Sequence, residues 1–161
     1  MIIIMGVSGC GKTTVGKLLS EKTKLPFYDA DDFHTDHNIQ KMKNHQALSD
    51  DDRTPWLEAL SNHIAAWENQ GGAILACSAL KEKYRDILSS KNTKINWVYL
   101  DGSFELIKSR LEKRHGHYMK ATLLESQFAT LEIPNYGCHT SVEKPLEEIV
   151  SDIITKFNLN E

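Results

Sequence analysis

The chain has 161 residues, a formal net charge of −3 and 25% charged residues of mixed sign. This length favours one domain with a substantial core, and the charge pattern excludes the basic patch typical of proteins that bind nucleic acid or anionic membranes. No apolar run approaches the length of a membrane span, and the first residues read directly as a strand, so we expect no leader peptide.

The first strongly patterned stretch is a strand, a glycine-rich loop and a helix. Residues 2–5 form an apolar run typical of a buried parallel strand, and Val15, Leu18 and Leu19 follow the spacing of a helical stripe. Residues 6–13 between them fit G-x-x-x-x-G-K-[ST], the phosphate-binding P-loop. The alternative, a chance glycine-rich turn, is disfavoured because strand, lysine and threonine are all in place.

This loop predicts a nucleoside triphosphate with Mg²⁺ as the ligand. Glycines let the backbone approach a polyphosphate, and the N–H groups of the first helical turn point at the anion. Lys12 can reach the β- and γ-phosphates, and the Thr13 hydroxyl can ligate Mg²⁺. The predicted nucleotide-binding residues are Gly6, Val7, Ser8, Gly9, Cys10, Gly11, Lys12, Thr13 and Thr14.

Acidic residues follow the second predicted strand, residues 25–28. Asp29 and Asp31 fall at its carboxyl end, which is where ligands bind in an open α/β sheet. A carboxylate here can hold Mg²⁺ or take the proton from an attacking hydroxyl, so we predict Asp29 as a metal ligand and Asp31 as a base. The alternative is a solvated acidic turn that caps the next helix.

The next segment contains an arginine beside three acids. We expect a short helix over residues 38–43 and a longer one that starts at Thr54 with Pro55 in its first turn. Arg53 lies just before that start and can grip a carboxylate in a bidentate manner. A local ion pair with residues 50–52 explains it equally well.

Two further strands are predicted over residues 73–77 and 96–100. The first ends in Cys77 and Ser78 rather than in an aspartate, so the carboxylate for Mg²⁺ must come from elsewhere, with Asp29 as the candidate. Lys81 opens the helix after this strand and therefore lies near the carboxyl edge of the sheet.

A pair of helices joined by glycine predicts a lid over about residues 110–130. Arg110 and Arg114 are four apart on a helix predicted over residues 103–114, and a second helix follows His115-Gly116-His117. Closing such a lid would bring positive charge to a transferring phosphoryl group and exclude water. The alternative is that the arginines lie on a solvated helix face.

The remaining elements complete an α/β domain. Residues 138–143 predict a weak fifth strand, and the apolar stripe over residues 146–157 predicts a final helix packed on the sheet. Alternating strands and helices indicate a parallel sheet, and we predict a single three-layer α/β/α domain over residues 1–161.

The three cysteines, Cys10, Cys77 and Cys138, have no metal-type spacing and predict free thiols in a cytoplasmic protein. Cys10 lies inside the P-loop, where a helix N-terminus can lower the pKa of a thiol. One hypothesis is therefore a reactive Cys10 that bound nucleotide protects, and the alternative is a shielded, inert thiol.

Distinct motifs run along nearly the whole chain: Met5-Gly6-Val7-Ser8-Gly9, Asp29-Ala30-Asp31-Asp32-Phe33-His34, Asn38-Ile39-Gln40-Lys41-Met42, Leu48-Ser49-Asp50-Asp51-Asp52-Arg53 with Pro55-Trp56-Leu57, Cys77-Ser78-Ala79-Leu80-Lys81 with Tyr84-Arg85-Asp86, and Gly116-His117-Tyr118-Met119 with Gln127-Phe128. Together they resemble the motifs of the small gluconate kinases, within the nucleoside-monophosphate-kinase-like P-loop fold. The P-loop names only the superfamily, whereas the other motifs are specific.

The resemblance implies transfer of the γ-phosphoryl group of ATP to the 6-hydroxyl of D-gluconate, feeding the pentose phosphate route. It also implies Mg²⁺, a homodimer and a five-stranded sheet of order 2-3-1-4-5. The predicted catalytic residues are Lys12, Asp31, Arg110 and Arg114. The predicted substrate-binding residues are Asp31, His34, Arg53, Lys81, His117 and Gln127.

The chain departs from the family pattern near its end. Residues 140–143 read Thr-Ser-Val-Glu where relatives carry an apolar strand ending in Asp-Ile-Asp, next to a loop that contacts adenine in this fold. Two other functions fit the same P-loop: a kinase for shikimate or another small acid, and a nucleotide-gated regulatory protein.

Overall fold

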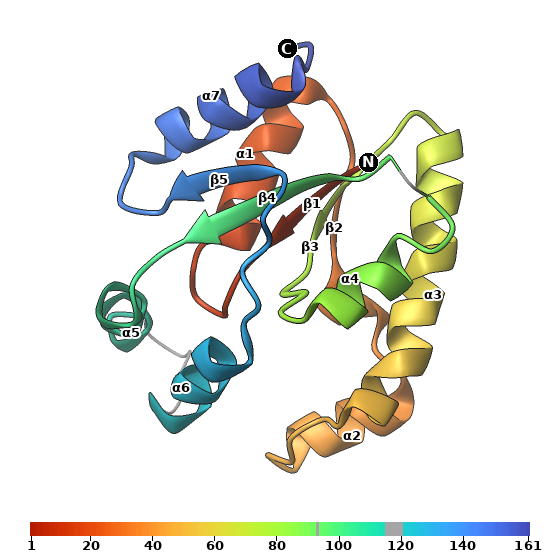
Figure 1. The fold of residues 1–161 in the computed structure, drawn as a ribbon, viewed down its shortest axis with the longest axis vertical. Coiled ribbons are helices and arrows are strands. Elements are labelled where there is room, and N and C mark those ends of the chain that lie inside the picture. The colour runs from red at the N-terminus through yellow and green to blue at the C-terminus, as the bar shows by residue number, and fades with distance from the viewer. Residues whose placement is uncertain (93, 115–120) are drawn as a thin grey trace.

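Five parallel strands form the centre of the molecule in a computed structural model that describes residues 1–92, 94–114 and 121–161. The strands are β1 (Ile2–Met5), β2 (Phe27–Asp29), β3 (Ile74–Ala76), β4 (Asn96–Asp101) and β5 (Cys138–Ser141). Their order is β2-β3-β1-β4-β5, with every pairing parallel. The predicted sheet and its order are therefore confirmed (Figure 1).

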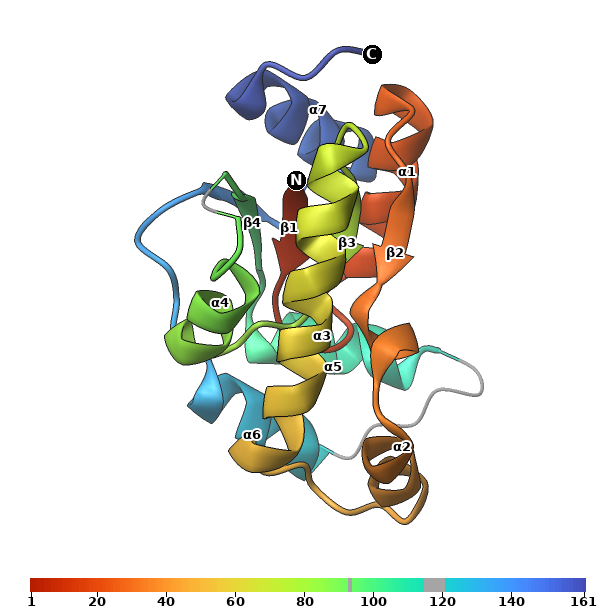
Figure 2. The ribbon, with the colours of Figure 1, turned by 90° about the vertical axis from the view of Figure 1, so that its right-hand side faces the viewer.

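Helices cover both faces of this sheet. The helical elements are α1 (Lys12–Thr23), the short 3₁₀ helix η1 (Ala30–Phe33), α2 (Asp36–Lys43), α3 (Asp50–Asn69), α4 (Glu82–Leu88), α5 (Phe104–Glu112), α6 (Ala121–Thr130) and α7 (Leu146–Phe157). Figures 1 and 2 show α1 and α7 on one side of the sheet and α3 and α4 on the other. In the described part of the chain, no helix is long and apolar enough to cross a bilayer.

The alternation of side chains along β1 builds two separate cores, as expected for a strand buried on both faces. Ile2 and Ile4 pack with the α1 and α7 side, and Ile3 and Met5 pack with the α3 and α4 side. All four side chains are essentially inaccessible to solvent. The P-loop that follows therefore begins from a rigid strand, which fixes its position.

Helix α3 begins four residues before the predicted start at Thr54. Ser49 caps it, and Ser49 and Asp52 exchange side-chain-to-backbone hydrogen bonds in a capping box. Pro55 consequently lies inside the helix, where it lacks one backbone donor. Since the capping box sets the start of the helix, the first turn carries the three acids, residues 50–52.

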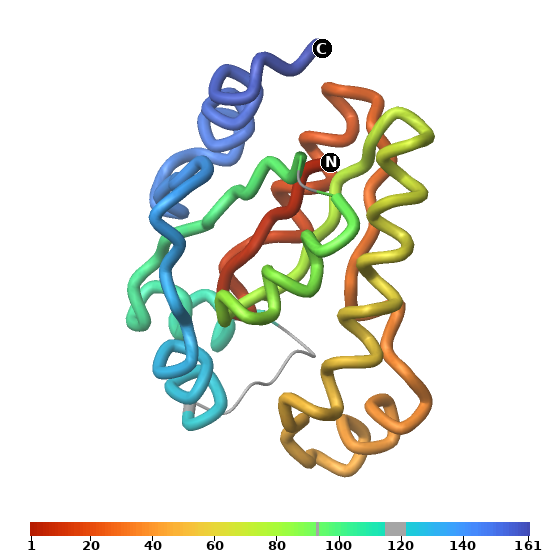
Figure 3. The backbone as a smooth tube through the Cα atoms, turned by 45° about the vertical axis from the view of Figure 1, so that its right-hand side comes forward, coloured from red at the N-terminus to blue at the C-terminus, as the bar shows by residue number. Residues whose placement is uncertain are grey.

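The carboxyl ends of the strands point toward one end of the molecule, where α2, the start of α3, and α6 also gather (Figure 3). At this end Glu132, just after α6, donates its N–H to the Leu80 carbonyl (2.8 Å) after β3. The predicted hinge His115-Gly116-His117 lies outside the described residues, as does the substrate-binding role predicted for His117.

Candidate active site

The P-loop joins β1 to α1 in a conformation that depends on glycine. Gly11 caps α1 at φ 102°, a left-handed value that other residues rarely adopt, and no side chain caps the helix. Gly9 also has a positive φ, and a Cβ there would lie 2.6 Å from Leu111 of α5. Because Gly11 has no side chain to accept from the N–H groups of the first turn, these donors suit an anionic ligand.

Lys12 lies in the first turn of α1 and bends back over the loop. Its ammonium donates to the carbonyls of Gly6 and Val7, both at 3.0 Å. These bonds hold a positive charge over the loop, where a phosphate chain can meet it.

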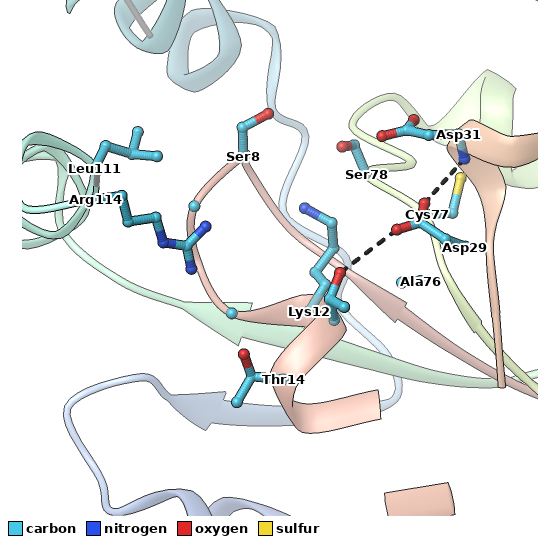
Figure 4. A pocket seen from close by; sticks show the side chains of 13 residues that line it. Ser8, Lys12, Thr14, Asp29, Asp31, Ala76, Cys77, Ser78, Leu111 and Arg114 are labelled. Carbon is cyan, nitrogen blue, oxygen red and sulfur yellow. Dashed lines mark hydrogen bonds between the residues drawn. The ribbon is translucent and has the colours of Figure 1, made fainter. Parts of the chain in front are cut away.

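The P-loop forms one wall of a cavity of about 470 Å³. The loop, the ends of β2 and β3, and α5 with the residues after it provide the lining: Ser8, Gly9, Gly11, Lys12, Thr13, Thr14, Asp29, Asp31, Ala76, Cys77, Ser78, Leu111 and Arg114. Figure 4 shows Asp29, Asp31 and Ser78 facing the loop from one side and Arg114 from the other. Carboxylates and cations therefore share one cavity.

Thr13 and Asp29, which both line this cavity, contact each other. The Thr13 hydroxyl donates to Asp29 Oδ2 at 3.5 Å, and Asp29 Oδ1 accepts from the Asp31 N–H at 3.0 Å (Figure 4). Among the described residues no group of three or more His, Cys, Asp or Glu side chains is arranged to hold a metal. A hydroxyl and one carboxylate suit Mg²⁺, which usually takes its other ligands from water and phosphate.

Asp31 presents its carboxylate to solvent, with 83% of its side chain exposed. His34 lies behind it, 4% exposed, with Nε2 3.7 Å from Asp31 Oδ1. The contact with His34 is the main cause that lowers the pKa of Asp31, and the charge of Lys12 adds to it, whereas desolvation by the neighbouring protein atoms opposes both. Asp31 is therefore an accessible, ionised carboxylate beside the P-loop.

Arg53 and Lys81 meet around the ring of Tyr84. The guanidinium of Arg53 lies 5.5 Å and the ammonium of Lys81 5.6 Å from the ring centre. Arg53 donates to the Leu48 carbonyl (2.8 Å) and to the Tyr84 hydroxyl (3.4 Å). No carboxylate of the described residues lies within 4.0 Å of Arg53, so the local ion pair with residues 50–52 is not formed.

Asp50 pairs instead with Lys81, Lys83 and the Tyr84 hydroxyl. These contacts, led by the one from Lys83, hold the pKa of Asp50 far below its ordinary value. Asp50 therefore pairs with Lys81, just before α4, and with Lys83 of α4. Among the described residues, no carboxylate is left paired with the guanidinium of Arg53.

The structure separates the two arginines of the predicted lid. Arg114 lines the cavity, whereas Arg110 donates to the Val142 carbonyl after β5 at 2.8 Å and is not a lining residue. The rule that residues four apart share a face holds only inside a helix, and α5 ends at Glu112. The catalytic role predicted for Arg110 has no support from this placement.

Gln127 of α6 contacts the P-loop. Its Oε1 accepts from the Ser8 N–H at 2.7 Å, and its Nε2 donates to Ser8 Oγ at 2.9 Å. Gln127 was predicted to bind the acceptor substrate, but here it holds α6 against the loop that precedes Lys12.

The pKa hypothesis for Cys10 is wrong in direction. Its side chain is buried, and burial raises the pKa of the thiol above its ordinary value, an effect larger than the opposing charge of Lys12. The shielded, inert thiol is the reading that the structure supports. The three cysteines are free and buried, as predicted for Cys77.

Sequence reasoning gave no role to Arg85, which is 2% exposed. Its guanidinium donates to the carbonyls of Ala79 (2.6 Å) and Glu132 (2.7 Å) and pairs with Glu82 (2.8 Å). It thus ties the loop after β3, which borders the cavity, to the segment that follows α6. In the sequence, only its place in the Tyr84-Arg85-Asp86 motif distinguishes it.

Comparison with known proteins agrees with this geometry. Residues 8–156 match the family described as shikimate kinase. The chain is 38% identical to the thermoresistant gluconokinase of Escherichia coli K12, over 94% of this chain and 90% of that protein. It is 39% identical to the gluconokinase of Gluconobacter oxydans, over 97% of this chain and 90% of the relative. The chain belongs to the gluconokinase family, within the broader shikimate kinase-like group.

Solved structures extend the likeness to three dimensions. A gluconokinase from Sinorhizobium meliloti superposes with a TM-score of 0.88 at 38% identity, covering 98% of this chain and 90% of that one. The predicted P-loop kinase fold and membership of the gluconokinases are therefore confirmed.

Proposed function

We propose that the protein transfers the γ-phosphoryl group of ATP to the 6-hydroxyl of D-gluconate. The observation that carries this is the shared cavity, in which the accessible carboxylate of Asp31 faces the P-loop with Lys12 and Arg114. A base, a phosphate-binding loop and two cations are the groups that phosphoryl transfer to an alcohol requires. The identity to gluconokinases supports gluconate as the acceptor.

Each group has a distinct proposed role. The loop N–H groups and Lys12 bind the phosphates, and Arg114 neutralises charge that develops on the transferring group. Asp31 takes the proton from the attacking hydroxyl. Thr13 and, through water, Asp29 would hold Mg²⁺, which would supply positive charge to the phosphates.

The far end of gluconate is a carboxylate, which needs a cation away from the P-loop. Arg53 is the proposed partner because its guanidinium fork matches a carboxylate and is bonded only to neutral groups among the described residues. Lys81 adds positive charge nearby, across the ring of Tyr84. We further propose a lid over about residues 110–130, a homodimer and a cytoplasmic location, as the resemblance implies.

A screen of acids with coupled detection of ADP tests the proposal. We expect turnover with D-gluconate and little with shikimate, the acceptor named in the matching family. Preference for shikimate would favour the alternative small-acid kinase, and binding of ATP without turnover of any acid would favour a regulatory protein.

The role of Asp31 has its own test within the same assay. Asp31→Asn should lower kcat by about 10²- to 10⁴-fold, the usual contribution of a general base, with a smaller effect on KM. Asp32→Asn, at the exposed neighbouring acid, is the matched control and should stay near the parent rate. If Asp31→Asn retains the parent kcat, Asp31 is not the base.

A further inference from the structure

The ring of His34, whose Nε2 faces Asp31, is held in place by its neighbours. Its ring stacks on Trp56, with centroids 4.1 Å apart and planes 17° from parallel. Trp56 is in turn fixed by a hydrogen bond from its Nε1 to the Ala30 carbonyl at 2.8 Å. With only 4% of its side chain exposed, His34 has little surface to offer a substrate. Its fixed ring instead suits it to act through its neighbours.

Asn38 of α2 contacts the other edge of that ring. Asn38 is fully buried, and its side-chain nitrogen donates to the backbone carbonyl of Asp52 at 2.9 Å. A carbonyl can only accept, so this bond fixes which end of the amide is the NH₂ group. Asn38 Oδ1 is buried with no hydrogen-bond partner among the described residues, so no competing bond turns the amide around.

The same NH₂ group lies 3.3 Å from His34 Nδ1. An amide NH₂ can only donate, so Nδ1 must be the acceptor. A neutral imidazole carries one proton, which must then be on Nε2, the nitrogen that faces Asp31 Oδ1 at 3.7 Å. That distance is longer than a hydrogen bond, but the exposed carboxylate can rotate, and such contacts often tighten when substrate binds.

We propose that Asn38 and His34 form a positioning pair, in which Asn38 selects the Nε2–H tautomer of His34 so that this N–H directs the carboxylate of Asp31. His34 is then a positioning residue rather than a substrate ligand, and one oxygen of Asp31 is held while the other stays free in the cavity. The tautomer follows from the contacts alone, whereas its catalytic consequence depends on the proposed role of Asp31.

Long-range ¹H–¹⁵N correlation NMR of the uniformly labelled full chain reads the tautomer directly. Spectra at alkaline pH, where imidazoles are neutral, should show the Nε2–H pattern for His34, whose signals are those lost in His34→Gln. The Nδ1–H pattern, or an even mixture of both tautomers, would overturn the proposal. This measurement needs no activity, so it stands even if Asp31 is not the base.

A pair of substitutions tests the consequence for catalysis. The glutamine amide in His34→Gln can place an N–H near the position of Nε2, whereas the shorter asparagine in His34→Asn reaches only as far as Nδ1. We expect His34→Gln to keep kcat within about 3-fold of the parent and His34→Asn to lose about 10-fold, the effect of one hydrogen bond. KM for ATP should be unchanged in both.

Equal kcat values in two folded variants would overturn the catalytic part of the proposal. Circular dichroism and thermal melting of each variant verify folding, and if either fails to fold, the NMR result on the parent decides. Failure of the proposed role of Asp31 gives a different pattern, in which Asp31→Asn keeps its kcat while the Nε2–H tautomer is still observed, and failure of the proposed function leaves the parent itself without turnover of gluconate.

Discussion

The nucleotide side and the acid side of this molecule are built in different ways. On the nucleotide side one continuous segment, residues 6–14, supplies the loop, and the ammonium of Lys12 bonds to carbonyls of its own loop. On the acid side η1, α2, α3 and α4 each contribute, and side chains join them. Asp52 of α3, for example, accepts from Lys41 of α2 at 2.6 Å.

This difference decides how each side should respond to substitution. The nucleotide side depends on local backbone geometry, so removing one side chain there should damage chemistry and spare the fold. The acid side depends on contacts between helices, so a side chain there can affect binding and local structure together. Substitutions on each side therefore test whether the two sides differ in this way.

On the nucleotide side the largest effect is expected at Lys12. Lys12→Ala should lower kcat by about 10²- to 10³-fold, the typical cost of removing one donor that stabilises transition-state charge. Its ammonium bonds only to two loop carbonyls among the described residues, so circular dichroism should match the parent. Lys17→Ala, on the exposed part of the same helix, is the control and should leave turnover unchanged. Parent activity in folded Lys12→Ala would contradict the P-loop role.

A smaller effect, on binding of the acid, is expected at Arg53. Arg53→Ala should raise KM for gluconate by about 10- to 100-fold, since a charge-assisted contact is worth roughly 1.5–3 kcal/mol. Steady-state kinetics with each substrate varied should show an unchanged KM for ATP. Arg53→Lys keeps the charge but loses the planar fork, so an intermediate KM is expected. If both variants have the same KM for gluconate as the parent, Arg53 does not bind the acid.

The difference between the two sides also explains which features could be predicted from the sequence. The strands and the P-loop follow from short-range patterns: apolar runs, glycines at fixed spacing and helical stripes. The order of the strands was implied by the resemblance to the gluconate kinases. The predicted start of α3 was wrong because the sequence offers two start signals close together, Thr54-Pro55 and the capping box of Ser49 and Asp52. The helix begins at the capping box.

For the acid side, the sequence could predict which residues take part but not which of them contact one another. Whether Arg53 pairs with its sequence neighbours or is left for a ligand depends on α4, whose Lys83 and Tyr84 bind Asp50. The contact of Gln127 with Ser8 spans 119 positions, and no periodic pattern encodes such a pair. Arg110 and Arg114 separate because α5 ends between them.

Gln127 links α6 to the nucleotide side, and a modest effect is expected there. Gln127→Ala removes two hydrogen bonds to Ser8, each worth about 1 kcal/mol, and should raise KM for ATP by about 3- to 10-fold. KM for gluconate should change less. Glu125→Ala, at an exposed position of the same helix, is the matched control. If gluconate binding alone weakens in Gln127→Ala, the residue belongs to the acid side as first predicted.

The smallest effect is expected at Cys10, where two features of the nucleotide side oppose each other. The N-terminus of α1 favours a thiolate, but the side chain is only 2% exposed, and burial raises the thiol pKa above its ordinary value near 9. Since the thiolate is the reactive form, native protein at pH 7 should incorporate almost no iodoacetamide at Cys10.

The pH dependence gives the sign of this effect. A raised pKa means that the thiolate forms at higher pH than for an ordinary thiol, so labelling of the native protein should be very slow at neutral pH and increase as the pH rises. Mass mapping with and without ATP measures this, and protein unfolded in guanidinium is the control, because all three thiols should then react. Rapid labelling of Cys10 at pH 7 that ATP prevents would mean that the helix terminus, rather than burial, governs this thiol.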